Sequence, residues 1–142
     1  MYGLHKITGR AKKCGPSALS AVLGLPTHEL ASVMREVTEK RAINGLHAYE
    51  MEMTLNHLDV DNEIEVYKGE KKPPTIAQWL SAADVGRYVV CNKKHWIAVA
   101  VFDGSKRDGE WADSGAWSGG RTPKPLTSVP LRVRLTHAIK VL

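Results

Sequence analysis

The stretch Lys13-Cys14-Gly15-Pro16-Ser17-Ala18-Leu19 is the most informative part of the chain. It predicts the start of a helix, because proline is favoured in a first turn and the apolar residues continue until Gly24 ends the pattern. A cysteine at a helix start faces unpaired backbone N–H groups and the positive end of the helix dipole, and both favour the thiolate. The alternative is a small buried residue that packs the helix start. Position alone leaves both interpretations open.

Two more helices are predicted in the opening third of the chain. Thr27 is placed to cap the second helix, whose apolar face comprises Leu30, Val33, Met34 and Val37. A third helix fits residues 48–58, where Met51, Leu55 and Leu58 recur at helical spacing.

Beyond residue 60 the apolar spacing becomes strand-like, apart from a short helix that Thr75 is placed to cap. Strands are predicted at 64–67, 88–91, 96–102 and 110–113 and within 131–142, with turns at Asp103-Gly104 and Asp108-Gly109. Helices followed by antiparallel strands predict an α+β domain. The 142 residues show no repeat and no shift in composition, so we expect a single domain across residues 1–142.

His95 differs from the other five histidines because it stands at the entrance of the most hydrophobic strand, Trp96 to Phe102. Asp113 lies on the strand that returns from it. A three-residue hairpin loop at 103–105 would set Asp113 directly opposite His95, close enough for the carboxylate to hold the imidazole. A longer loop would shift this register by a few positions. A histidine at a strand end with satisfied hydrogen bonds is the simpler alternative.

A Cys-Gly that opens a helix, a later histidine before a hydrophobic strand, and Asp113-Ser114-Gly115 after a hairpin together resemble the papain-like cysteine peptidase fold. The pattern is most similar to the compact bacteriocin-leader-processing peptidases and their small bacterial and phage relatives, and it covers residues 8 to about 117. The resemblance implies a helical half that opens at Cys14, followed by an antiparallel sheet. It also implies Cys14 as nucleophile, His95 as general base and acid, and Asp113 as the residue that orients the imidazole.

The chain departs from the family pattern at the residue that helps to stabilise the oxyanion. The family places a glutamine six residues before the cysteine, whereas this chain has Thr8. The backbone N–H of Cys14 is one candidate donor, and Thr8 and Lys13 are candidates for the second. Loss of one such donor typically lowers kcat by about 100- to 1000-fold. The departure therefore predicts a slow enzyme, an enzyme with a substituted donor, or an inactive relative.

Gly15, Trp96 and Trp117 are the candidate residues that line the cleft, with Trp117 between the glycines at 115 and 119. Tryptophans in this chain are also expected to fill the core, since it has only one phenylalanine. The two cysteines and six histidines show no metal-ligand spacing, and no phosphate-binding glycine motif is present. We therefore expect no metal and no cofactor. Residues 118–121 are predicted to form a flexible loop.

The net charge of +5 is concentrated at the two ends of the chain. Residues 1–13 and 118–142 contain nine basic residues and no acidic ones. We expect Lys6, Arg10, Lys12 and Lys13 to lie around one end of the cleft, with Arg132 and Arg134 within reach of that end. These charges favour an acidic protein segment as the ligand. Nucleic acid is the less favoured partner, because no helix is rich in arginine or lysine. A merely solvating basic surface is the simplest alternative.

These observations predict a cysteine peptidase-like hydrolase that cleaves a peptide or isopeptide bond through a thioester. Two alternatives remain open: an acyl transferase or amidase with the same triad, and a catalytically weak adaptor or inhibitor that binds an acidic partner. No apolar run is long enough to span a bilayer and no secretory signal is evident, so a cytoplasmic location without membrane contact is expected.

Overall fold

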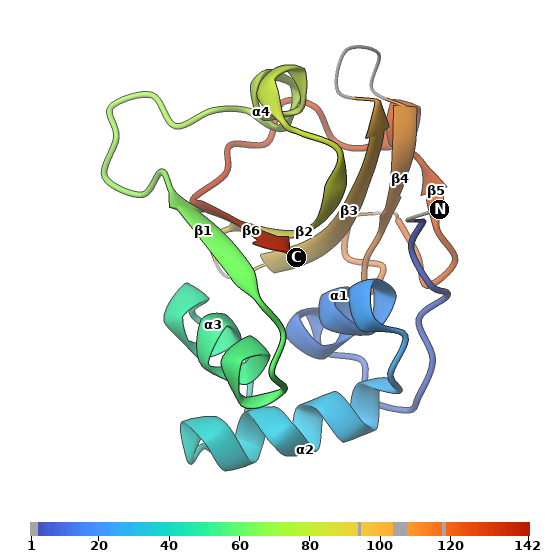
Figure 1. The fold of residues 1–142 in the computed structure, drawn as a ribbon, viewed down its shortest axis with the longest axis vertical. Coiled ribbons are helices and arrows are strands. Elements are labelled where there is room, and N and C mark those ends of the chain that lie inside the picture. Colours follow the sequence, from blue (N-terminus) through green and yellow to red (C-terminus); the bar gives the residue numbers. More distant parts are fainter. Residues whose placement is uncertain (1–2, 94, 104–107, 118) are drawn as a thin grey trace.

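A computed structural model describes residues 3–93, 95–103, 108–117 and 119–142 of the chain, which form helices packed on one antiparallel sheet (Figure 1). The helices are α1 (Cys14–Leu23), α2 (Thr27–Thr38), α3 (Ala48–His57) and α4 (Ile76–Ala82), with a 3₁₀ turn at Leu126–Ser128. The strands are β1 (Asn62–Val66), β2 (Gly86–Asn92), β3 (His95–Asp103), β4 (Asp108–Ala112), β5 (Lys124–Pro125) and β6 (His137–Val141). They lie in the order β1-β6-β2-β3-β4-β5, with every neighbouring pair antiparallel. The predicted α+β class is confirmed.

The central strands bury both of their faces, which explains their nearly continuous apolar sequence. Side chains alternate between the faces with a period of two. One face packs on α1, α2 and α3 and includes Val89, Cys91, Trp96, Ala98 and Ile139. The other face packs on α4 and the segment after β5 and includes Tyr88, Val90, Ile97, Val99 and Ala138. The sheet therefore separates two hydrophobic clusters. Figure 1 shows α1, α2 and α3 on one side of the sheet and α4 on the other.

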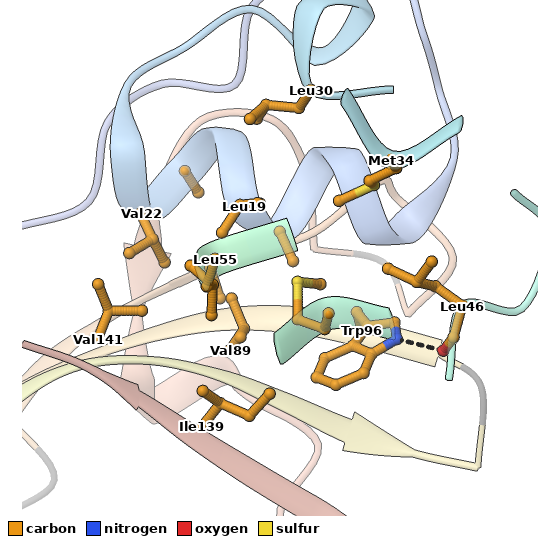
Figure 2. Close-up of a cluster of buried hydrophobic side chains, with 14 of the residues drawn as sticks. Leu19, Val22, Leu30, Met34, Leu46, Leu55, Val89, Trp96, Ile139 and Val141 are labelled. Atoms are coloured by element: carbon orange, nitrogen blue, oxygen red, sulfur yellow. Dashed lines mark hydrogen bonds between the residues drawn. The ribbon is translucent and has the colours of Figure 1, made fainter. Parts of the chain in front are cut away.

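Trp96 fixes the position of the helical layer over the start of β3. It is fully buried, and its indole N–H donates a hydrogen bond of 2.8 Å to the carbonyl of Leu46 (Figure 2). Leu46 in turn packs against the first turn of α1, because a Cβ added at Gly15 would lie 3.1 Å from its Cδ2 atom. The segment between α2 and α3 thus joins the start of β3 to the start of α1.

Most predicted elements are present, with differences at their ends. The helix at Cys14 ends at Leu23, where Gly24 adopts a left-handed conformation with φ 79°, and Thr75 caps α4 as predicted. Thr27 is the first residue of α2 rather than its cap, a role taken by Pro26. The strand predicted within 131–142 begins only at His137, because residues 131–135 form their backbone hydrogen bonds with residues 74–77 at the start of α4 instead of pairing in the sheet. Gly104 of the predicted Asp103-Gly104 turn lies outside the described residues.

None of the helices formed by the described residues is long and apolar enough to cross a membrane.

Candidate active site

Cys14 is the first residue of α1 and is partly buried. Lys13 precedes the helix in an extended conformation and provides no side-chain cap. The thiol therefore lies where the unpaired N–H groups of the first turn and the helix dipole favour negative charge. This local placement is the one that the sequence predicts.

His95, the first residue of β3, joins Cys14 to Asp113. The imidazole forms a side-chain hydrogen bond with Cys14, and its Nε2 atom lies 3.4 Å from Asp113 Oδ2. That second contact has ion-pair distance but not the alignment of a hydrogen bond among the described residues. The three side chains are thus brought together in the order thiol, imidazole, carboxylate.

Asp113 follows directly after β4 and is completely buried. Its Oδ1 atom accepts a hydrogen bond of 2.8 Å from the backbone N–H of Gly115, and its Oδ2 atom accepts one of 3.1 Å from that of Trp117. These bonds form because the chain turns back over the carboxylate. They hold Asp113 in place independently of His95.

The register between β3 and β4 differs from the prediction based on a three-residue loop. Ala98 pairs with Ala112, with an irregularity between Val101 and Asp103. Asp113 therefore comes opposite Ile97, two residues further along β3 than His95. A shift of two keeps a side chain on the same face of a sheet, and diagonal neighbours remain within reach of long side chains. The predicted proximity survives, but the directly opposed pairing is wrong.

The charges of the three groups support one another. Burial raises the pKa of the Cys14 thiol, but the hydrogen bonds with His95 and with the backbone of Trp96 and Gly15 outweigh it, so the pKa is lowered. Burial lowers the pKa of His95, but Asp113 and Cys14 raise it more strongly, to about 9. Burial raises the pKa of Asp113, and its contacts with His95 and with the N–H groups of Trp117 and Gly115 lower it overall. This arrangement favours a thiolate, an imidazolium and a carboxylate near neutral pH.

Of the three residues predicted to line the cleft, Trp117 lies beside His95, whereas Trp96 and Gly15 are buried. The ring of Trp117 lies against that of His95, with centroids 4.3 Å apart and planes tilted by 53°, so Trp117 packs on the imidazole. Trp96 does not line the cleft, because its side chain is fully buried in the core. Gly15 is also buried, beneath Leu46, and contributes its backbone next to Cys14.

The candidate oxyanion donors are not equally placed. Lys13 and the backbone of Cys14 are adjacent to the thiol. The backbone N–H of Thr8 donates to Ser20 Oγ at 3.4 Å, and its carbonyl accepts from Thr27 N–H at 2.7 Å. Ser20 lies six residues along α1 from Cys14, a rise of about 9 Å. The structure thus does not bring the short Thr8 side chain to the thiol.

The segment 119–121 contributes to the site, although the sequence predicts a flexible loop there. The backbone N–H of Asp113 donates to the carbonyl of Gly120 at 3.1 Å. Arg121 accepts a backbone hydrogen bond from Ile7 and donates one of 2.6 Å from its guanidinium to Gly9. The flexible-loop prediction is therefore wrong for these three residues, and Ser118 lies outside the described residues. The adjacent glycines, which allow close backbone approach, were the available signal.

Cys91, the second cysteine, lacks the features that lower the pKa of the Cys14 thiol. Its side chain is buried, its Sγ donates to the carbonyl of Lys93 at 2.8 Å, and burial raises its pKa to about 12. Within the described part of the chain, no group of three or more His, Cys, Asp or Glu side chains is arranged to hold a metal ion.

The basic residues near the two ends of the chain contact different elements of the fold. The guanidinium of Arg134 contacts the carbonyl of Pro73, in the loop before α4. Residues 5–9 run beside the second half of α1, where His5 N–H donates to Ala21 O at 2.8 Å. Of the basic residues predicted to surround the cleft, Lys12 and Lys13 are the ones beside Cys14.

A scan against protein-family models and a search of the curated proteins found no match. Solved structures similar to this one are peptidase domains. The peptidase domain of Streptococcus ComA, a bi-functional ABC transporter involved in quorum sensing, matches with a TM-score of 0.62 and 14% identity over 99% of this chain and 98% of that domain.

Two further structures match in the same way. A double glycine motif protease from an AMS/PCAT transporter, solved in complex with its leader peptide, gives a TM-score of 0.60 at 14% identity, over 99% of this chain and 91% of that one. The peptidase domain of Streptococcus mutans ComA gives a TM-score of 0.53 at 16% identity, over 97% of this chain and 99% of that one. The chain has the α+β papain-like fold of these peptidase domains.

Proposed function

We propose that this chain is a cysteine peptidase in which Cys14, His95 and Asp113 act together. The observation that carries the proposal is the position of His95, which contacts the Cys14 thiol on one side and the Asp113 carboxylate on the other. A nucleophile, a base and a group that orients the base form the arrangement that thiol acyl transfer requires. The fold, shared with peptidase domains, supports the same reaction class.

The reaction begins with attack of the Cys14 thiolate on a peptide carbonyl, which forms a C–S bond. The imidazolium of His95 then donates its proton to the amine as the C–N bond breaks, leaving an acyl thioester on Cys14. In the second half, His95 removes a proton from water, and the resulting hydroxide displaces the thiolate. The products are an amine and a carboxylate, and the enzyme regains its thiolate–imidazolium pair.

Asp113 positions His95 through its Nε2 atom, which leaves Nδ1 for the thiol and the leaving amine. The buried carboxylate also stabilises the imidazolium. The backbone N–H of Cys14 supplies one oxyanion donor, and Lys13, which directly precedes Cys14 in the chain, is a candidate for the second. A peptidase with this incomplete set of donors is a slow one.

We propose a peptide as the substrate. The similar protease that was solved with a leader peptide, and whose motif is a double glycine, supports a peptide with a Gly-Gly centre as the first test substrate. The basic residues beside Cys14 favour a substrate that also contains acidic residues.

Alkylation by iodoacetamide tests the state of the thiol. Cys14 should react much faster at pH 7 than an ordinary exposed thiol, while Cys91 remains unlabelled because it is buried and protonated. Mass spectrometry of the labelled peptides distinguishes the two cysteines. A Cys14 that reacts no faster than a thiol of pKa about 8.5 would contradict the catalytic proposal and favour a binding protein.

Turnover is tested on end-blocked Gly-Gly peptides, with the Cys14→Ala variant as control. Wild-type protein should release both fragments and the variant neither. Addition of a primary amine then separates hydrolysis from acyl transfer, because a transferase forms the amide of the added amine. Cleavage that persists in Cys14→Ala would rule out Cys14 as the nucleophile.

A further inference from the structure

A basic pocket lies beside Cys14, between the start of α1, the helix α2 and the segment that follows α2. Its rim is formed by Lys12, Lys13, Arg35 and Arg41, and its floor includes the buried side chains of Ala31 and Ile43. The cavity volume is about 340 Å³. This volume is sufficient for one or two amino-acid side chains.

None of the described residues forms an ion pair with the basic side chains of this pocket. No carboxylate lines it among the described residues, and within that part of the chain none of its four basic side chains forms an ion pair. Lys40, directly before Arg41, shows the contrast, because its Nζ lies 2.7 Å from Glu50 Oε2. Four neighbouring cations without a partner raise the local concentration of anions and favour binding of a ligand with negative charge.

Residues that line the pocket adjoin the proposed catalytic cysteine along the chain. Lys13 immediately precedes Cys14. On the opposite side, residues 41–44 lead to Leu46, which packs against Gly15 and accepts the hydrogen bond of Trp96. Because Lys13 lines the pocket and directly precedes Cys14, three or four residues of an extended peptide, which span about 10 to 13 Å, are enough to join the two.

The floor of the pocket distinguishes between anionic ligands. A phosphodiester backbone would satisfy the cations but would leave the apolar surface of Ala31 and Ile43 unused. A peptide in which acidic and apolar residues alternate satisfies both, since the apolar side chain enters the pocket while the carboxylates remain at the rim.

We propose that this basic pocket is a substrate-recognition site for an acidic–apolar peptide segment located three or four residues from the bond that is cleaved. The inference rests on the proposed peptidase function and adds Arg35 and Arg41 as residues that determine specificity. They act on binding of the substrate and take no part in the chemistry at Cys14.

Binding to the Cys14→Ala protein tests the inference without the need for turnover. The probes are end-blocked peptides with a Gly-Gly centre that carry Glu-Leu-Glu, three or four residues away on one side or the other, and matched peptides with Gln-Leu-Gln. In isothermal titration calorimetry at low salt, the better-placed acidic peptide should bind about tenfold more tightly than its glutamine counterpart, because two exposed ion pairs together contribute about this factor.

The double variant Arg35→Gln/Arg41→Gln should reduce this preference to below about twofold. Lys71→Gln/Lys72→Gln is the matched control, since it removes the same charge from exposed positions outside the pocket and should preserve the preference. An equal loss in both double variants would show a general effect of net charge and would contradict a specific pocket.

Three other results would overturn the proposed site. These are equal binding of acidic and neutral peptides, no binding of any peptide, and displacement of the acidic peptide by duplex DNA with a salt slope near −0.9 per phosphate. Failure of the peptidase proposal is a separate result, because it appears as a lack of cleavage by the wild-type protein even when Cys14→Ala binds the acidic peptide.

Discussion

His95 lies between two negative groups, and its protonation state decides how the residues of the site behave. The carboxylate of Asp113 lies 3.4 Å from Nε2 and the Cys14 thiolate lies on the other side of the ring. Despite burial, these neighbours raise the pKa of His95 to about 9. The proposed activity requires a thiolate and an imidazolium together, so it is confined between the lowered pKa of Cys14 and the raised pKa of His95.

The pH profile of kcat/KM should therefore have an alkaline limb near pH 9. Asp113→Asn removes a negative charge next to the imidazolium, so it should shift this limb to lower pH and reduce kcat. Rates measured from pH 5 to 10 on one Gly-Gly peptide report both effects. An unchanged alkaline limb in Asp113→Asn would show that another group sets the pKa of His95.

Thr8→Gln should increase the rate of a slow wild-type enzyme. The threonine side chain ends far from Cys14, because its backbone is fixed to Ser20 and Thr27, whereas a glutamine amide extends several ångströms further and can donate to the oxyanion. An increase in kcat of at least about tenfold is expected if the added donor regains part of a 100- to 1000-fold effect. Thr8→Leu is the control for side-chain length, and an equal rate in the two variants would contradict the role of the amide.

At the scale of elements, the sequence identifies the residues of the site better than their exact alignment. The helix at Cys14 and the strand at His95 follow from proline, glycine and an apolar run, which are local signals. The offset between β3 and β4 depends on the irregularity near Val101 and on the loop between the strands, and neither has a clear signature in sequence. Asp113 remains near His95 because the register differs from the expected one by two residues, and a shift of two residues leaves a side chain on the same face of the sheet.

The segment after β4 was not predicted because its order comes from contacts that are distant in sequence. Gly120 bonds to Asp113, and Arg121 bonds to Ile7 and Gly9. Glycine and serine in this stretch resemble a mobile loop when only neighbouring residues are considered. The function of these glycines becomes clear only from the side chains that pack against them.

Gly119→Ala should impair the site through Asp113. A Cβ atom at this position would lie 2.4 Å from Asp113 Oδ1 and 2.6 Å from Trp111 Cζ3, so the carboxylate has to move. A displacement of this kind should lower kcat by on the order of 100-fold and also shift the alkaline limb that His95 produces. Thr122→Ala, an exposed change in the same segment, is the control. A reduced rate with an unaltered pH profile would indicate loss of folded protein instead.

At the scale of the whole molecule, the candidate site is assembled from the two layers of the fold. Cys14 begins α1 in the helical layer, His95 begins β3 of the sheet, and Asp113 directly follows β4. Figure 1 shows these two layers. The hydrophobic core shown in Figure 2 holds these layers together. It includes Leu19 from α1 together with Val89 and Ile139 from the sheet. The sequence could not show which basic residues this packing gathers. Arg35 and Arg41 join Lys12 and Lys13, whereas Arg134 lies by Pro73.

The thiolate–imidazolium pair should make stability depend weakly on pH between about 6.5 and 9. The raised pKa of His95 stabilises the fold below its unfolded pKa of 6.5, and this contribution is lost as pH rises through about 9. The lowered pKa of Cys14 has the opposite sign, because it adds stability as pH rises towards the unfolded pKa of the thiol. The two effects have opposite signs, so they offset each other wherever Cys14 is ionised in the folded state.

Cys14→Ser should remove this compensation, since serine does not ionise. The free energy of unfolding of the variant should fall with rising pH through the pKa of His95, with a slope of up to about 1.4 kcal/mol per pH unit. Urea unfolding at several pH values between 6 and 9.5 measures the slope. Parallel curves for the wild-type protein and Cys14→Ser would show that Cys14 is not ionised in the folded state.

The contact between Trp117 and His95 should make the fluorescence of Trp117 report the protonation state of His95. The two rings are 4.3 Å apart, a distance at which a protonated imidazole quenches the fluorescence of an indole. Emission from the resting protein, without substrate, should therefore rise as pH passes through about 9 and His95 loses its proton. Trp117→Phe should abolish this rise while the three other tryptophans continue to emit. The protein thus contains its own optical indicator of the imidazolium.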